Sequence, residues 1–266
     1  MFRTFFVSAL CAALATPTLA ACTFSQLQNI TAAYIAAQST GKLPARISSA
    51  TYTENFKSAH IQKGIISKAL KIDHNRSLYD TVTCSTFTEL IVASNSHPYV
   101  LGTQIALADD RTKIKRIDTI ITTTGDWQFN ATGTLYWSKQ EDIASGWETI
   151  PEENRDTRAV IKAAADAYLD VFSDSAVVVP WGTPCAKLEG GLYSGTGEEN
   201  DSCNTGVPSG TKIVNRRYVI DETVGSVDVF LNFGGDKGNP DSHNFRILEG
   251  NIRYIHTITH GQILGF

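Results

Sequence analysis

Two histidines and a tyrosine near the C-terminus have the spacing of an acid–base site. His243 and His256 flank Glu249-Gly250, a turn signal between two β-rich runs. If these two turn residues close a hairpin, counting outward places His243 opposite His256. Strand alternation then puts both imidazoles and Tyr254 on one face. Because histidine titrates close to neutral pH, we expect these three residues to be catalytic and to transfer protons.

Two other interpretations of the histidines stay open. A hydrogen-bonded pair of imidazoles in a half-buried sheet would need no catalytic role, although ionisable groups on an apolar face usually have a reason to be there. A metal site completed by Asp241 or Glu222 is disfavoured, since the sequence lacks helical histidine spacing and Cys-x-x-Cys motifs. Nucleophile elbows, phosphate loops and dinucleotide fingerprints are also missing, so we expect neither a metal nor a cofactor.

Aromatic residues of the second half could line a cavity for a flat or hydrocarbon ligand, although most such residues form ordinary core. Arg217 has the strand parity of Asp221, so we expect it to pair with that carboxylate or to bind a substrate oxygen. Arg253 falls on the face opposite the histidines and should not reach a ligand. The candidates for substrate contact are Trp181, Arg217, Tyr218, Phe230 and Phe245.

Amphipathic helices and β-rich runs must position these residues. Helical periodicity predicts helices from about residue 24 to 40, ended by Gly41, and from 155 to 172, capped by Asn154. Strands are expected over 78–83, 85–93, 100–108 and 114–123, and three more runs between 215 and 260 form an antiparallel meander. Residues 128–153 show no sustained period and are interpreted as a connection.

The two halves of the chain repeat each other. Each half has an amphipathic helix, an irregular segment and a meander that ends in an isoleucine-spaced strand. Lys113-Ile-Lys-Arg-Ile-Asp-Thr-Ile matches Asn251-Ile-Arg-Tyr-Ile-His-Thr-Ile, which places Asp118 at the position of His256. A repeat of this length predicts a duplicated domain. We expect a first α+β domain over 21–127, a connection over 128–153 and a second α+β domain over 154–266.

The N-terminus predicts secretion. Arg3, the apolar run that follows it and Thr18-Leu-Ala are typical of a signal peptide covering residues 1–20. Its removal also takes Cys11 and leaves 22 of the 23 basic residues against 27 acidic residues, which disfavours nucleic acid and membrane partners. Four sequons predict exposed, glycosylated positions at Asn29, Asn75, Asn130 and Asn200.

Four cysteines remain in the mature chain, and an even number in a secreted protein predicts disulfides. Three pairings are formally possible. We expect Cys22 to pair with Cys84 and Cys185 with Cys203, because each bridge then lies within one half and neither forces the halves to thread.

A helix followed by a strongly bent antiparallel sheet resembles the SnoaL-like cone, which is related to the nuclear-transport-factor fold, and the chain resembles two such cones in tandem. Its second half also resembles a secreted fungal family of mostly unassigned function. The shared motifs are Pro180-Trp-Gly-Thr-Pro-Cys, Leu188-Glu-Gly-Gly, Asn215-Arg-Arg-Tyr-Val-Ile-Asp-Glu and Pro240-Asp-Ser-His-Asn-Phe-Arg.

That family includes the hetero-Diels-Alderases of tropolonic sesquiterpene biosynthesis, which join a tropolone quinone methide to humulene. The resemblance therefore implies a secreted, cofactor-free pericyclase of secondary metabolism with small apolar or polyketide-derived substrates, and it is compatible with a homodimer. The alternatives are a SnoaL-like isomerase or cyclase and a secreted protein that binds a small molecule without catalysis.

Overall fold

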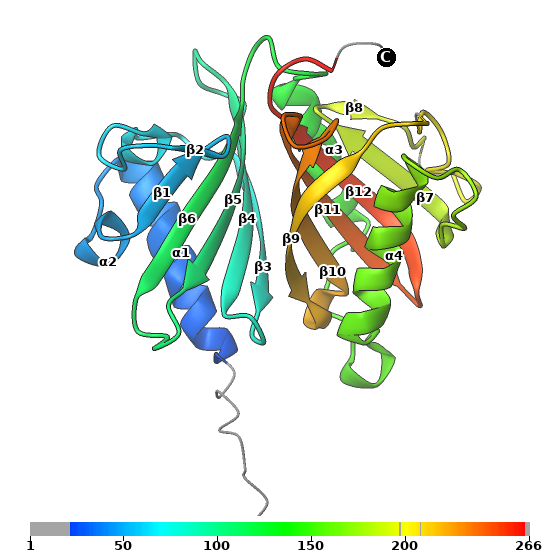
Figure 1. Cartoon of the computed structure of the whole chain (residues 1–266), viewed down its shortest axis with the longest axis horizontal. Coiled ribbons are helices and arrows are strands. Elements are labelled where there is room, and N and C mark those ends of the chain that lie inside the picture. Colours follow the sequence, from blue (N-terminus) through cyan, green and yellow to red (C-terminus); the bar gives the residue numbers. More distant parts are fainter. Residues whose placement is uncertain (1–21, 197, 208, 264–266) are drawn as a thin grey trace, which may run out of the picture.

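Two six-stranded sheets face each other, and each carries a long helix on its outer side (Figure 1). This computed structural model describes residues 22–196, 198–207 and 209–263. The expected signal peptide lies outside the described residues. No helix among those residues is long and apolar enough to cross a membrane. The architecture is mixed α+β, as expected from the sequence.

The first sheet is built from the N-terminal half. Helix α1 starts at Thr23, whose side chain accepts a hydrogen bond from the Gln26 amide, and ends at Gly41 in the left-handed conformation. The first-half elements are α1 (Phe24–Thr40), α2 (Ala45–Ser48), β1 (Thr51–Glu54), β2 (Lys57–Ser58), η1 (Ile65–Ser67), β3 (His74–Asp80), β4 (Ser85–Val92), β5 (Tyr99–Leu107) and β6 (Ile114–Thr122).

The second sheet follows two helices. Helix α4 begins after Thr157, whose hydroxyl caps the Val160 amide, so the expected cap at Asn154 is wrong by three residues. The elements are α3 (Ala131–Ile143), η2 (Glu152–Asn154), α4 (Arg158–Val171), β7 (Trp181–Glu189), β8 (Leu192–Tyr193), β9 (Ile213–Asp221), η3 (Glu222–Val224), β10 (Ser226–Phe233), β11 (Asn239–Leu248) and β12 (Asn251–Thr259).

The duplication is visible in the strand order. The sheets run β2-β1-β6-β5-β4-β3 and β8-β7-β12-β11-β10-β9, which is one topology used twice. Asp118 lies opposite Gln104 and beside Thr53, and His256 lies opposite Asn244 and beside Leu188. Their expected equivalence is therefore confirmed. Both sheets are mixed and not purely antiparallel, since β1 pairs with β6, and β7 with β12, in parallel.

The outer face of each sheet is covered by its helix. The first core gathers Leu27, Ile30 and Tyr34 of α1 against β4, β5 and β6. The second gathers Ile161, Ala165 and Tyr168 of α4 against β10, β11 and β12. A third apolar cluster lies where the inner faces meet, and its members come from both halves: Leu78, Phe87, Ile91, Val100, Ile120, Ala131, Val219, Phe230 and Ile258.

Strands β3 and β9 lie side by side across the junction and bind each other reciprocally. The Ile220 amide donates to Asp80 Oδ2 at 3.0 Å, and the Tyr79 amide donates to Asp221 Oδ2 at 2.9 Å. Because Asp80 and Asp221 occupy equivalent positions, one interaction is made twice, once in each direction. Arg158 adds a two-pronged ion pair to Asp80, at 2.8 and 2.6 Å.

Both expected disulfides are present, Cys22 with Cys84 and Cys185 with Cys203. Such bridges fit an extracellular or secretory protein. All four sequon asparagines are exposed, as glycosylation would require. Helix α3 was not expected, because it lies inside the segment interpreted as a connection.

Candidate functional site

A β-bulge separates the two histidines. The turn at Glu249-Gly250 forms as expected, with Leu248 opposite Asn251 and Ile247 opposite Ile252. The pairing then shifts by one residue, so that Arg246 lies opposite Tyr254 and Arg253 has no partner of its own. The predicted pairing of His243 with His256 is therefore wrong. His243 faces Thr257, and His256 faces Asn244.

The shift places the two imidazoles on opposite faces of the sheet, because one extra residue reverses every side chain beyond it. His243 lies on the outer face, where its ring stacks on Phe245 at 5.9 Å. His256 lies on the inner face, 5.2 Å from the Trp147 ring and close to residues of the first half. Tyr254 shares the inner face with His256, so the three residues form two separate sites.

On the outer face, His243 is paired with a buried carboxylate. Its Nδ1 lies 3.0 Å from Asp241 Oδ1, and the two side chains are only 2% and 1% exposed. The Thr259 hydroxyl donates to the other oxygen of Asp241 at 3.1 Å. Burial raises the pKa of Asp241, and the adjacent His243 opposes that rise. The contact is an ion pair, since neither Asp241 Oδ1 nor His243 Nδ1 makes a well-aligned hydrogen bond among the described residues.

A cavity of about 200 Å³ opens at this pair. Its lining is mostly apolar and also includes the polar side chains of Glu189, Thr257 and Thr259. The Tyr168 ring lies 5.7 Å from His243, and its pKa is raised by burial and by the charges of Glu189 and Asp241. The lining residues are Trp127, Phe172, Glu189, Gly206, Phe233, Asp241, His243, Thr257, Thr259 and Ile263.

On the inner face, His256 lies between two carboxylates, and the Arg76 guanidinium lies 3.4 Å from its Nδ1. Its Nε2 lies 2.7 Å from Glu141 and its Nδ1 lies 3.4 Å from Glu89. Burial would lower the pKa of His256, but the charges of Glu141 and Glu89 outweigh it and raise the pKa to about 9. His256 is therefore an imidazolium at neutral pH, which suits an ion-paired structural role better than general base catalysis.

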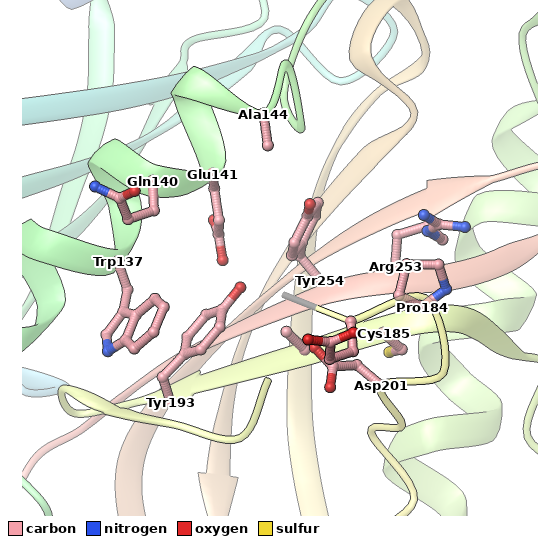
Figure 2. A pocket seen from close by; sticks show the side chains of 12 residues that line it. Trp137, Gln140, Glu141, Ala144, Pro184, Cys185, Tyr193, Asp201, Arg253 and Tyr254 are labelled. Atoms are coloured by element: carbon pink, nitrogen blue, oxygen red, sulfur yellow. The ribbon is translucent and has the colours of Figure 1, made fainter. Parts of the chain in front are cut away.

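Tyr254 lines a second cavity, of about 250 Å³, between α3 and the edge of the second sheet (Figure 2). Trp137 and Glu141 enter it from α3, and Tyr193 enters it from β8. Arg253, expected not to reach a ligand, borders this cavity, but its Nη1 donates to the Thr183 carbonyl at 3.2 Å. Figure 2 shows its guanidinium directed away from Glu141.

None of the five predicted substrate contacts lines the His243 cavity. Phe245 and Trp181 pack in the second core around Tyr168, and Phe230 lies between the sheets. The Tyr218 hydroxyl donates to Asp166 at 2.6 Å.

Arg217 does not pair with Asp221. It binds Asp118 of the first half at 2.8 Å, because its strand faces the other sheet.

Sequence reasoning missed Tyr168, Glu189 and Thr257, and it considered Asp241 only as a metal ligand. The signal for Asp241 was present, since a residue two positions before His243 shares its strand face. The other three come from distant segments that only the fold brings together. In the described part of the chain, no three His, Cys, Asp or Glu side chains are placed to bind one metal ion.

Comparison with protein families finds a match in the second half of the chain. A family described as a domain of unknown function, DUF8021, matches residues 154–259. No curated protein matches the chain. The matched segment begins just before α4 and ends with β12, so the chain is similar to this family over the half that holds the His243 cavity.

Proposed function

We propose that the chain is a secreted, cofactor-free enzyme that transforms a small, largely apolar molecule in the His243 cavity. The observation that carries this proposal is the buried Asp241–His243 pair at the wall of a mostly apolar cavity. Ionisable groups are costly to bury, and a titratable pair that opens on a cavity is a common arrangement at catalytic sites. His243 would transfer the proton, and Asp241 would hold its ring in orientation.

The reaction that we propose is a hetero-Diels-Alder cyclisation between a tropolone quinone methide and humulene. It rests on the resemblance of the second half to the secreted family that includes such enzymes, and on the helix over a sheet in each half, which is compatible with a SnoaL-like cone. His243 would protonate the hydroxyl that leaves the tropolone precursor as water, and the ring hydroxyl would return a proton to it, which yields the neutral quinone methide. Cycloaddition then needs orientation but no further proton.

The cavity volume favours a second candidate. About 200 Å³ is smaller than the ~300–1,000 Å³ of pockets that enclose drug-sized ligands. One reactant fits inside, so the olefin of a two-reactant cyclisation would have to lie across the mouth. A SnoaL-like isomerase or cyclase with a single substrate needs no such extension.

The test is turnover by purified protein. The tropolone precursor that still carries its leaving hydroxyl is incubated with humulene, and the adduct is quantified and its enantiomers are resolved. We expect His243→Asn to lower the rate about 10²- to 10⁴-fold, as is usual for a lost general acid or base. His97→Asn is the matched control, because His97 is exposed and far from Asp241 in the sequence. Circular dichroism checks that each variant is folded.

The outcomes separate the candidates. Adduct formation at the uncatalysed rate, together with conversion of the precursor alone, would favour the single-substrate enzyme. Binding of the precursor without any conversion would favour the non-catalytic binding protein. Full activity of a folded His243→Asn variant would remove the active site from this cavity.

A further inference from the structure

We propose that the cavity lined by Trp137, Glu141, Tyr193 and Tyr254 binds a small organic ammonium ion. It is separate from the His243 cavity and shares no lining residue with it. Its volume of about 250 Å³ suits a ligand of one ring and a short amine chain. The inference goes beyond the proposed function and does not depend on it.

A buried carboxylate points into this cavity with an unused oxygen. Glu141 is 2% exposed, and its Oε2 accepts hydrogen bonds from His256 Nε2 and Trp147 Nε1, each at 2.7 Å. Its Oε1 is buried and makes no well-aligned hydrogen bond among the residues that the structure describes, although the Tyr193 hydroxyl interacts with this carboxylate. An unsatisfied buried carboxylate oxygen costs free energy, so a ligand that donates an N–H group here would relieve that cost.

Aromatic rings flank the same carboxylate. Trp137 stacks on Tyr193 with ring centroids 4.1 Å apart, and Trp147 stacks on Tyr254 at 5.8 Å. Figure 2 shows the Glu141 carboxylate pointing toward the Tyr193 hydroxyl, with the Tyr254 ring to one side. Aromatic faces attract cations, and several rings around one acidic group are the usual means of recognising an organic ammonium ion.

The charge of the cavity has the sign that an ammonium ion requires. Glu141, Glu198 and Asp201 line it, and Arg253 is the single cation among its lining residues. The Arg253 guanidinium is directed away and held by the Thr183 carbonyl. The positive charges of His256 and Arg76, the latter 3.8 Å from Glu141, balance Glu141 and Glu89, so the excess negative charge comes from Glu198 and Asp201. The cavity therefore keeps a negative potential toward its mouth.

The inference is tested with three probes of the same size class. These are 2-phenylethylamine, its neutral analogue 2-phenylethanol, and phenyltrimethylammonium, which has a positive charge but no N–H group. Isothermal titration calorimetry with the full chain gives each affinity, and a change in tryptophan fluorescence reports binding. We expect the amine to bind at least about tenfold more tightly than the alcohol, since a hydrogen bond to a charged group contributes ~1.5–3 kcal/mol. The quaternary ion should fall between them.

Two variants locate the binding. Glu141→Gln should weaken amine binding about 10- to 150-fold, from the same hydrogen-bond range, and Glu152→Gln is its matched control at an exposed acidic position. Because Glu141 also holds His256, Tyr193→Leu provides an independent variant, for which loss of a cation–π contact predicts about a 2- to 30-fold weakening. His243→Asn should leave amine binding unchanged, whatever its effect on turnover.

Equal affinity for the amine and the alcohol would overturn the inference. So would unchanged amine affinity in Tyr193→Leu, even if Glu141→Gln failed to fold. Failure of the cyclisation assay would leave these binding results standing.

Discussion

Replacing Asp228 by asparagine should stabilise the protein at neutral pH and weaken it slightly in acid. Asp228 lies on the inner face of β10 and is 0% exposed. Its oxygens accept hydrogen bonds from Gln104 of the first half at 2.7 Å and from Ser242 at 2.5 Å. No cation within the described part of the chain forms an ion pair with it, so burial, with a smaller contribution from the charges of Glu89 and Asp241, raises its pKa to about 8.

The pKa sets the size of the effect. A folded-state pKa above the unfolded value of 3.8 means that stability is full below pH 3.8 and is lost as the pH rises toward 8. At ~1.36 kcal/mol for each pKa unit, the loss is about 4 kcal/mol at pH 7 and about 6 kcal/mol above pH 8. Asparagine cannot ionise and escapes this loss, but a less suitable hydrogen bond should cost it about 1 kcal/mol.

The free energy of unfolding, measured by urea titration from pH 3 to pH 9, checks this reasoning. We expect Asp228→Asn to be about 1 kcal/mol less stable than the wild type at pH 3 and about 3 kcal/mol more stable at pH 7. Asp118→Asn is the matched control, since Asp118 is also buried but pairs with two arginines. This variant should be less stable than the wild type at neutral pH, because the arginines lose their charged partner. Parallel profiles for the wild type and Asp228→Asn would refute the assignment of a neutral carboxyl at this site.

Three further predictions follow from the junction and the bridges. The pKa of His256 is about 9, above its ordinary 6.5, so its contribution to the free energy of unfolding is complete below pH 6.5 and is lost as the pH rises through 9. This loss is about 3 kcal/mol. In the double variant Asp228→Asn, His256→Gln, the free energy of unfolding should therefore stay constant from pH 6.5 to pH 9. Arg217→Leu should lower the free energy of unfolding by about 2 kcal/mol, because Asp118 keeps Arg116 and Thr53 but loses its partner across the junction, and a urea midpoint equal to that of the wild type would contradict this. Joint replacement of Cys185 and Cys203 by serine should cost about 3 kcal/mol by calorimetry, since the bridge closes a loop with a sequence separation of 18, and an unchanged melting temperature would argue against the loop-closure explanation.

Local patterns predicted the elements whose signals are apolar and periodic. The helix from Phe24, the turn at Glu249-Gly250 and the isoleucine-spaced strands all formed as expected. Helix α3 was not predicted from the sequence because the residues that it buries are small or polar. These residues recur at helical spacing but are not strongly hydrophobic: Ala131, Thr134, Ser138 and Glu141. The buried face of α3 takes part in a polar network, and a search for hydrophobic periodicity does not detect such a helix.

The candidate site was predicted in composition but not in geometry. The bulge at Arg253 leaves the hairpin turn intact and moves His243 and His256 to opposite faces, so an error of one residue divided one site into two. The first half has the same shift between Ala106 and Leu107, where Lys115 takes the place of Arg253. No residue type marks either bulge, since neither position is glycine. His243 therefore lines a cavity, as the sequence pattern predicted, but its predicted pairing with His256 is wrong.

The reciprocal hydrogen bonds of Asp80 and Asp221 have a consequence for how the chain is made. Translation is vectorial, so the first sheet leaves the ribosome well before β9 and β12 exist. During that interval Asp80 lacks Arg158 and the Ile220 amide, and the inner-face side chains of Leu78 and Phe87 lack their cover. Until the second half is synthesised, the first sheet exposes an apolar surface, and exposed apolar surfaces are prone to aggregation.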